Sequence, residues 1–390
     1  YSLVSTDSQS NISGNIITFT PSTSGTANIQ YKATDSIGGY SAVGTIVVTV
    51  YPTVVPTPPA NVQVTPGASS NTWTIPLSGG NDPYIASVEP IDPSYGTIEL
   101  NKDGTITYTP PVVVSKKLAS ELVKGSKSVT ITYVIKDKTG ATYTKTFTIT
   151  LYDPIVVTSS AYTGEITMSS AKKPLTFSLT ATGGNGTYTY SLVSTDPQST
   201  ISNNIITFTP STSGTATIQY QGTDSNGGKS AVGSITVTVN TAIAANPVSG
   251  GQFTPGSPNE TYNVTLTGGD KPVLTGASVV VSGNGSVTFD ATAGTITYSP
   301  PAAPSSLLKV ATPVTINFTA GDNFGGNYTG SFTISLNDKI VVTPSATTGS
   351  IDIGETPLTF TLSASGGNGT YTYSLVSTDS QSNISGNIIT

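Results

Sequence analysis

The stretch YSLVSTDSQSNISGNIIT occupies residues 1–18, and the same eighteen residues occur again at 373–390. A slightly altered copy, YSLVSTDPQSTISNNIIT, occupies residues 190–207. The sequence therefore returns to its own start at residue 373, which indicates a tandem array. We expect both ends of the sequence to cut through a repeat of a longer array, and we expect no catalytic site in it.

The repeated stretch belongs to a larger module, which we call the first type. Residues 1–50 align with 190–239 without a gap, and forty of the fifty positions are identical. Upstream of the later copies lies a front half, PIVVTSSAYTGEITM from Pro154 and KIVVTPSATTGSIDI from Lys339. Isoleucine and valine alternate with hydroxyl residues from Ser234 to Val239. Because side chains alternate between the two faces of a strand, this pattern predicts a half-buried β-strand.

A second module type lies between the copies of the first. DGTITYTPP at 103–111 matches AGTITYSPP at 293–301, and VTITYVIKDKTGATYTKTFTITL at 129–151 matches VTINFTAGDNFGGNYTGSFTISL at 314–336. Threonine occupies every second position from Thr142 to Thr150, as expected of a solvated sheet face. Residues 136–140, KDKTG, predict the hairpin turn before this strand.

These patterns predict an all-β chain of two-sheet sandwiches with about seven short strands per module. Two segments depart from the strand pattern. Tyr51 to Pro59 is rich in proline and predicts a polyproline II linker, and Ser115 to Lys124 predicts a short helix. The expected units are 1–51 (back half, first type), 52–152 (second type), 153–240 (complete first type), 241–338 (second type) and 339–390 (front part, first type).

Composition excludes several classes of function. The chain has no Cys and no His, which excludes zinc fingers, thiol chemistry and the usual nucleophile–histidine pairs. Its net charge is −6, with fifteen basic residues that form no cluster, so we expect no nucleic-acid partner. No apolar run reaches the length of a membrane-spanning helix, and we expect no membrane insertion in this segment.

The sequence resembles two groups of repeats. The first type, with GGNGTYTYSL, FTPSTSGTATI and YQGTDSNGGKSAVGSITVTV, resembles the Ig-like repeats of large bacterial and archaeal surface proteins. The second type, with DGTITYTPP and TYVIKDKTGATYTKTFTITL, resembles the cadherin-like repeats of giant secreted adhesins. The resemblance covers nearly the whole chain. It implies tandem Ig-like antiparallel β-sandwiches, arranged head to tail as a rod, in an exported stalk, filament or adhesin.

Acidic turn residues recur in the modules and are the candidate metal ligands: Asp35, Asp137, Asp224 and Asp322. Calcium requires six to eight converging oxygen ligands. An aspartate that caps its own hairpin turn needs no metal. No junction between modules offers a cluster of acids like that of calcium-binding cadherin repeats, so we favour turn capping and expect no cofactor.

Asn-X-Ser/Thr sequons are candidate N-glycosylation sites, although their number is close to chance in a chain this rich in Ser and Thr. They lie at Asn11, Asn185, Asn259, Asn263, Asn284, Asn317, Asn327, Asn368 and Asn383. The Asn-Gly pairs at 185–186, 284–285 and 368–369 also predict tight hairpin turns. Tyr188 with Tyr190, and Tyr371 with Tyr373, are expected as core or tyrosine-corner residues rather than as a sugar-stacking platform.

The sequence therefore favours a structural, non-enzymatic repeat segment at the cell surface or outside the cell. The alternative is an adhesin repeat that itself binds a glycan or protein receptor through a cleft present in each copy. The expected partners are further copies of the same repeats, covalently continued or joined head to tail by strand donation. The duplicated eighteen residues favour covalent continuation. A surface with few charges also allows lateral bundling or a coat of covalent glycans.

Overall fold

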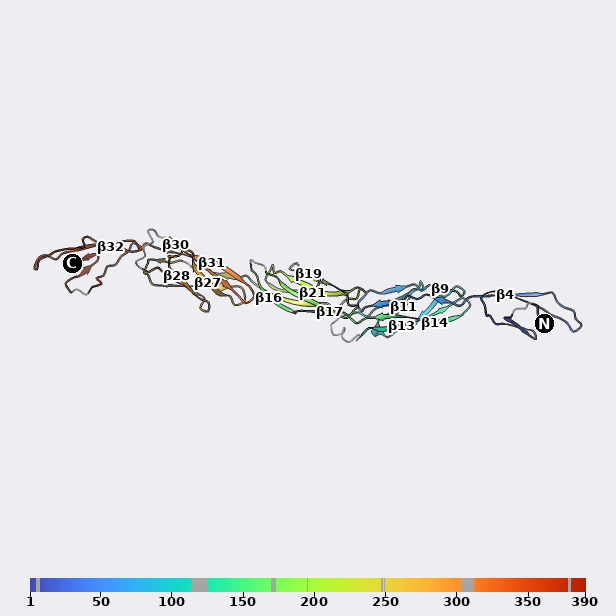
Figure 1. The fold of residues 1–390 in the computed structure, drawn as a ribbon. Coiled ribbons are helices and arrows are strands. Elements are labelled where there is room, and N and C mark those ends of the chain that lie inside the picture. Colours follow the sequence, from blue (N-terminus) through green and yellow to red (C-terminus); the bar gives the residue numbers. More distant parts are fainter. Residues whose placement is uncertain are drawn as a thin grey trace.

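The chain forms a row of β-sandwiches, one after another in sequence order, with the two termini at opposite ends (Figure 1). This computed structural model describes residues 1–4, 8–113, 125–169, 173–194, 196–246, 248, 250–302, 312–377 and 380–390. The helix predicted over Ser115 to Lys124 lies outside the described residues. Three buried apolar clusters, within residues 54–151, 155–239 and 253–336, follow one another along the row.

Residues 156–240 show the complete arrangement of the first type, which consists of two four-stranded sheets facing each other across one core. In sheet order, one sheet contains β15 (Val156–Ser159), β17 (Leu175–Thr182), β20 (Ile205–Phe208) and β19 (Ser199–Ser202), and the other contains β16 (Thr163–Thr167), β22 (Gly233–Asn240), β21 (Gly214–Asp224) and β18 (Tyr188–Leu192). All neighbours are antiparallel except β16 and β22, which run parallel.

The alternation predicted for residues 234–239 is confirmed. Ile235, Val237 and Val239 are buried in the core, and the intervening hydroxyl residues are exposed. Since each strand buries one apolar face against the opposite sheet, the hydrophobic effect holds the two sheets together.

The two copies of the second type share one strand order. In the first copy, one sheet has the order β10 (Tyr84–Val88), β13 (Lys127–Lys136), β14 (Thr142–Leu151) and β7 (Val62–Val64). A second sheet has the order β11 (Thr97–Leu100), β12 (Ile106–Thr109) and β8 (Asn71–Trp73), and β6 (Val55–Pro56) pairs with β9 (Leu77–Ser78). The 3₁₀ helix η1 (Pro93–Tyr95) precedes β11. In the second copy, the first sheet has the order β27 (Val273–Val279), β30 (Thr312–Gly321), β31 (Asn327–Leu336) and β24 (Gln252–Phe253). The second sheet has the order β28 (Ser286–Asp290), β29 (Thr295–Ser299) and β25 (Glu260–Asn263), and β23 (Ala244–Ala245) pairs with β26 (Leu266–Thr267). Here again one edge strand, β7 or β24, pairs parallel with the last strand of its module.

Two local predictions are wrong. Within the expected polyproline linker, Val55–Pro56 pairs with β9 and Val54 is buried in the core, because the chain enters the next sandwich sooner than its proline content suggests. The Asn-Gly turns at 185–186 and 284–285 do not close hairpins. The strands on either side of each turn, β17 with β18 and β27 with β28, lie in different sheets.

The chain ends carry partial sandwiches. Residues 1–50 form the sheet β1 (Ser2–Leu3), β4 (Gly25–Lys32) and β5 (Gly44–Val50) and the hairpin of β2 (Ser10–Ser13) with β3 (Ile16–Phe19). Residues 341–389 form one sheet of β32 (Val341–Pro344), β33 (Phe360–Ser365), β35 (Ile388–Ile389) and β34 (Ile384–Ser385). Each end therefore resembles a different part of the complete 153–240 module.

Candidate functional site at the module junctions

The turn aspartates cap their own turns in both module types. In the first type, one carboxylate oxygen of Asp224 accepts hydrogen bonds from the amides of Asn226 (3.1 Å) and Gly228 (2.9 Å), and the other accepts one from the amide of Asn185 (3.0 Å). The second oxygen therefore ties the β21–β22 turn to the turn after β17. This capping is the arrangement that the sequence favoured over a metal site.

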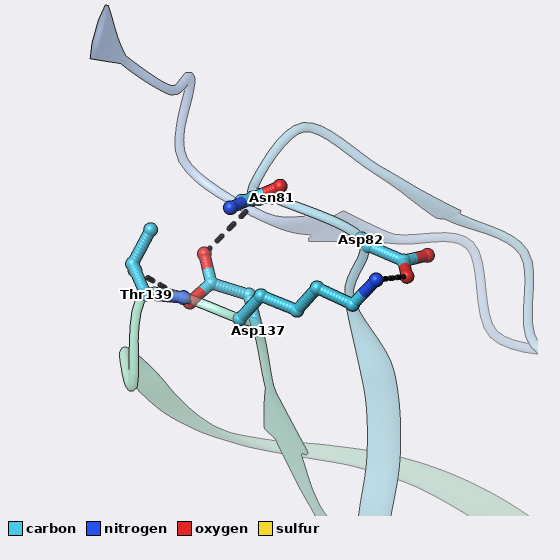
Figure 2. Close-up of polar contacts among 5 residues, drawn as sticks. Asn81, Asp82, Asp137 and Thr139 are labelled. Atoms are coloured by element: carbon cyan, nitrogen blue, oxygen red, sulfur yellow. Dashed lines mark hydrogen bonds and ion pairs between the residues drawn. The ribbon is translucent and has the colours of Figure 1, made fainter.

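The same arrangement recurs in the second type. Asp137 accepts amide hydrogen bonds from Thr139 (2.9 Å) and Asn81 (3.2 Å), and beside it Lys138 forms an ion pair with Asp82 at 2.6 Å (Figure 2). Asp322 likewise accepts from the amides of Phe324 (3.0 Å), Gly326 (2.6 Å) and Asp270 (2.9 Å). Among the described residues no three Cys, His, Asp or Glu side chains gather as metal ligands would.

Sequence reasoning missed that Asp224 also binds the preceding module. The Thr65 hydroxyl donates to the Asp224 carboxylate at 2.6 Å, although the two residues lie 159 positions apart. Both side chains are nearly inaccessible to solvent, with 0% of Thr65 and 5% of Asp224 exposed. Thr65 directly follows β7, the edge strand that runs parallel to β14, and this pairing places the hydroxyl at the end of its sandwich. We call this contact the first junction.

A second junction repeats the contact one module further on. Thr167, the last residue of β16, donates its hydroxyl to Asp322 of the 241–338 module, and its amide donates to the Phe324 carbonyl at 3.3 Å. Thr167 is 2% exposed. Buried hydrogen bonds to a charged group contribute more than neutral ones, at about 1.5–3 kcal/mol each. The same pair of residue types thus joins the modules in both orders, second type to first and first type to second.

The last glycine of each turn allows this close approach. A Cβ added at Gly228 would lie 2.4 Å from Thr65 Cβ, and one added at Gly326 would lie 2.7 Å from Thr167 Cγ2. Both distances are shorter than real carbon–carbon contacts, so a larger residue would push the neighbouring module away. The Gly-Gly pair of the turn is therefore needed for docking as well as for the shape of the turn.

Backbone hydrogen bonds also fix the linkers. The amides of Gly80, Gly184, Gly269 and Gly367 donate to linker carbonyls at 2.7–2.9 Å. These carbonyls belong to Pro52, Asp153, Thr241 and Asp338. A small apolar contact of Val113 with Ala231 and Val156 adds to the first junction. The side-chain bond and the apolar contact therefore join neighbouring modules, and the backbone bonds fix each linker on the module that follows it.

Two of the turn aspartates, Asp137 and Asp322, have pKa values below the ordinary value. For Asp322, burial raises the pKa, but the hydrogen bonds from the Thr167 hydroxyl and from the turn amides outweigh it, so the pKa lies below its ordinary value. For Asp137, the hydrogen bonds led by that of the Thr139 hydroxyl lower the pKa. Both groups therefore favour the charged form in the folded chain.

We expect the chain to lose stability in acid. A carboxyl group whose folded pKa is lowered contributes stability above its unfolded pKa of about 3.9, and this contribution is lost as the pH falls through the folded value. The melting temperature should be nearly constant at neutral pH and fall below about pH 4. Asp322→Asn should weaken this dependence, whereas Glu260→Gln, at an exposed position in the same module, should not. An equal effect of both substitutions would contradict the assignment.

The fourth turn aspartate, Asp35, caps its turn through the amides of Ile37 (3.1 Å) and Gly39 (2.7 Å). In the part of the chain that the structure describes, no threonine of another module lies against it. Its neighbours Ile37 and Tyr40 are 92% and 78% exposed.

The other candidates are dispersed over the chain. Asn284 is 7% exposed and its carbonyl accepts the Tyr298 hydroxyl at 2.7 Å, so the folded chain encloses this sequon. Asn185 is half-buried, and the remaining sequon asparagines are exposed. The Tyr371 hydroxyl donates to the Gly366 carbonyl at 2.5 Å, and the Tyr188 hydroxyl bonds to the corresponding Gly183 carbonyl. These bonds fit the structural role expected for the tyrosines.

Comparison with known proteins identifies one module. Residues 52–150 match the sequence model of the bacterial Ig domain family. Residues 52–150 are thus similar to a bacterial Ig domain. This domain contains β6 to β14 and the Asp137 turn of Figure 2. No curated protein matches the chain.

Solved structures similar to the chain are arrays of Ig or cadherin domains. The I-band fragment I67–I69 of titin is 12% identical, with coverage of 71% of this chain and 95% of that one and a TM-score of 0.31. The first four extracellular cadherin domains of protocadherin gamma B7 are 16% identical, with coverage of 80% and 83% and a TM-score of 0.24. Drosophila N-cadherin EC1–3 is 12% identical, with coverage of 72% and 99% and a TM-score of 0.22. No helix among the described residues is long and apolar enough to cross a membrane.

Proposed function

We propose that this chain is a structural segment of an extracellular filament, stalk or giant surface protein, and that it provides length without catalysis. Ig-like repeat families are generally non-catalytic, and domains of this kind are typically extracellular. The observation that carries the proposal is the threonine–aspartate hydrogen bond that recurs at both junctions, buried at the first and partly buried at the second. A chain of independent binding modules on flexible linkers has no need of such a bond. A rod that transmits force or holds a distance does.

Small-angle X-ray scattering of the chain tests this role. A rod should give a narrow cross-section and a length on the order of 35–45 Å per module, since strands rise about 3.3 Å per residue. Thr65→Val with Thr167→Val should leave each sandwich folded and broaden the distribution of lengths. If the wild-type chain already scatters as freely jointed beads, the junctions do not set the shape and the proposal fails.

A second candidate function, an adhesin repeat that binds a glycan or protein receptor, is favoured by a polar groove that recurs in both copies of the first type. Gln198, Thr212, Ser213 and Thr215 line it in one copy, and Gln9, Thr23, Ser24 and Thr26 line it in the other. The Gln198 side-chain oxygen accepts the Ser211 amide at 2.8 Å, and that of Gln9 accepts the Ser22 amide at 2.7 Å. Binding of the chain to a glycan array, lost in Gln9→Ala with Gln198→Ala, would support this role.

A further inference from the structure

Four asparagines precede glycine in the chain, at 185, 226, 284 and 368. This pair is chemically reactive, because glycine has no side chain that shields its backbone nitrogen. The nitrogen attacks the side-chain carbonyl carbon of the asparagine and displaces the amide group as ammonia. The reaction requires a side chain folded back over the next peptide, a nitrogen without a hydrogen-bond acceptor, and access to water. The three pairs within the complete modules differ in these conditions.

The side chain of Asn185 is folded back over Gly186. Its carbonyl oxygen accepts a hydrogen bond from the Thr187 amide at 3.2 Å. This Asx turn closes a ring around the Asn185–Gly186 peptide, which brings the side-chain carbon toward the Gly186 nitrogen. The donor also polarises the carbonyl group, and this favours attack at its carbon. The same bond recurs at Asn368, where the Thr370 amide donates at 3.1 Å.

The Gly186 nitrogen is available for this attack. Among the described residues its amide donates to no acceptor. Gly186 has a φ of 87°, and a Cβ built on it would have no atom within 4 Å. Asn185 is only half-buried, so water reaches the turn. All three conditions for the reaction are therefore met at this pair.

Asn226 precedes Gly227 in the β21–β22 turn but is held away from it. Its side-chain amide donates to the Thr65 hydroxyl at 3.4 Å, across the first junction. The Gly227 amide donates to the Asp224 carbonyl at 3.0 Å. Because both bonds would have to break before the nitrogen could attack, the folded chain protects this pair.

Asn284 is protected by burial. Only 7% of the residue is exposed, and its backbone carbonyl accepts the Tyr298 hydroxyl at 2.7 Å. A Cβ built on Gly285 would lie 2.5 Å from the Ser299 carbonyl oxygen and 2.8 Å from the Tyr298 ring. The turn therefore has little room for the side chain to fold back, and little access to water.

A carboxylate is compatible with the position of Asn185. In the 241–338 module Asp270 takes this place, since its amide donates to Asp322 at 2.9 Å as the Asn185 amide does to the equivalent acid. The Asp270 carboxylate accepts from the side-chain amide of Asn323 at 3.1 Å. Ser225 has the place of Asn323. Its hydroxyl accepts from the Asn185 side-chain amide and can turn to donate to a carboxylate, so the product fits the folded chain.

This pair also lies at the first junction. The Asp224 oxygen that accepts the Asn185 amide at 3.0 Å is the one that accepts the Thr65 hydroxyl at 2.6 Å. Loss of the amide group would add one negative charge to the chain, beside this carboxylate. Charge in this turn is thus coupled to the contact that holds two modules together.

We propose that Asn185 is a site of spontaneous deamidation. The Gly186 nitrogen bonds to Asn185 Cγ, the Cγ–Nδ2 bond breaks, and the Gly186 amide proton leaves with Nδ2 as ammonia. One water molecule then opens the cyclic imide at either of its carbonyl carbons, which gives aspartate or isoaspartate. The reaction needs only solvent water. The inference goes beyond the proposed structural role and does not depend on it.

Peptide mapping by mass spectrometry tests this site. The full chain is kept in a mildly alkaline buffer, folded in one sample and unfolded by guanidinium in the other, and conversion of each asparagine is followed over weeks. In the unfolded sample Asn185, Asn226 and Asn284 should react at similar rates, because each precedes glycine. In the folded sample the latter two should react at least about tenfold more slowly than Asn185, because their contacts must first open locally.

The products test the route. The cyclic imide gives isoaspartate together with aspartate, whereas direct attack by water on the side chain gives aspartate alone. The matched control is Asn185→Gln, whose longer side chain does not close this ring readily. It should stay unconverted while Asn226 and Asn284 keep their rates. Equal rates at Asn185 and Asn284 in the folded chain overturn the proposal, as does a product at residue 185 without isoaspartate.

Discussion

Replacing Ile131 with alanine should lower the free energy of unfolding of the 52–152 module by about 2–5 kcal/mol, the range for deleting a buried aliphatic side chain. Ile131 is fully buried on β13, opposite Phe147 of β14. Because a close-packed core relaxes only partly around a deleted side chain, the lost contacts add to the lost transfer free energy.

The chain has a built-in probe for this measurement. Trp73 is its single tryptophan, and its ring lies 5.6 Å from that of Phe147 in an edge-on arrangement. Tryptophan fluorescence during urea unfolding therefore reports this one module within the full chain. With a slope of about 1–3 kcal/mol per molar urea, the midpoint should fall by roughly 1–2 M.

The matched control is Thr148→Ala. Thr148 is exposed on the outward face of β14 and should change stability by no more than about 0.5 kcal/mol. If the two substitutions had equal effects, the assignment of inward and outward faces in this sheet would be wrong.

The strand faces are predictable from sequence because a strand's period of two is local. Thr142 to Leu151 alternates over ten residues, and every inward position from Phe147 onward is buried. The turn aspartates are predictable for the same reason. Asp137 accepts a hydrogen bond from the amide of Thr139, two residues ahead of it, and both residues lie within the sequence KDKTG.

The junction donors were not predictable by the same reasoning. Thr65 meets Asp224 across 159 positions, and one threonine is hard to distinguish in a chain this rich in threonine. A signal does exist, because Thr-Pro-Gly occurs at 65–67 and again at 254–256 in otherwise diverged modules. Its meaning depends on the parallel edge strand that carries the threonine to the end of the sandwich, and parallel pairing has no local pattern.

Asp224→Ala should have the largest effect at a junction. It removes the acceptor of the buried Thr65 hydroxyl and of the amides of Asn185, Asn226 and Gly228. Each buried donor left unpaired costs about 1–3 kcal/mol, although water that enters the loosened junction recovers part of this. We expect faster hydrogen exchange at the Gly228 amide and a wider range of lengths in solution scattering.

Asp35→Ala is the matched control. The turn of residues 34–39 differs from the aligned turn of residues 223–228 only in having Ile37 in place of Asn226. Asp35 caps its turn in the same way, and no threonine of another module among the described residues donates to it. The substitution should speed exchange at the Gly39 amide but leave the scattering curve unchanged. A change in length from Asp35→Ala as large as that from Asp224→Ala would show that the carboxylate acts only within its own turn.

Thr65→Val separates the junction from the turn. Valine has nearly the shape of threonine, so the packing against Gly228 is kept while the hydroxyl donor is lost, and Asp224 retains its three amide donors. The stability of the 52–152 module, followed by Trp73, should be nearly unchanged, whereas the junction should weaken by about 1.5–3 kcal/mol, the range for a hydrogen bond to a charged group. Thr254→Val makes the same change beside the same Pro-Gly pair and should have no effect on the monomer.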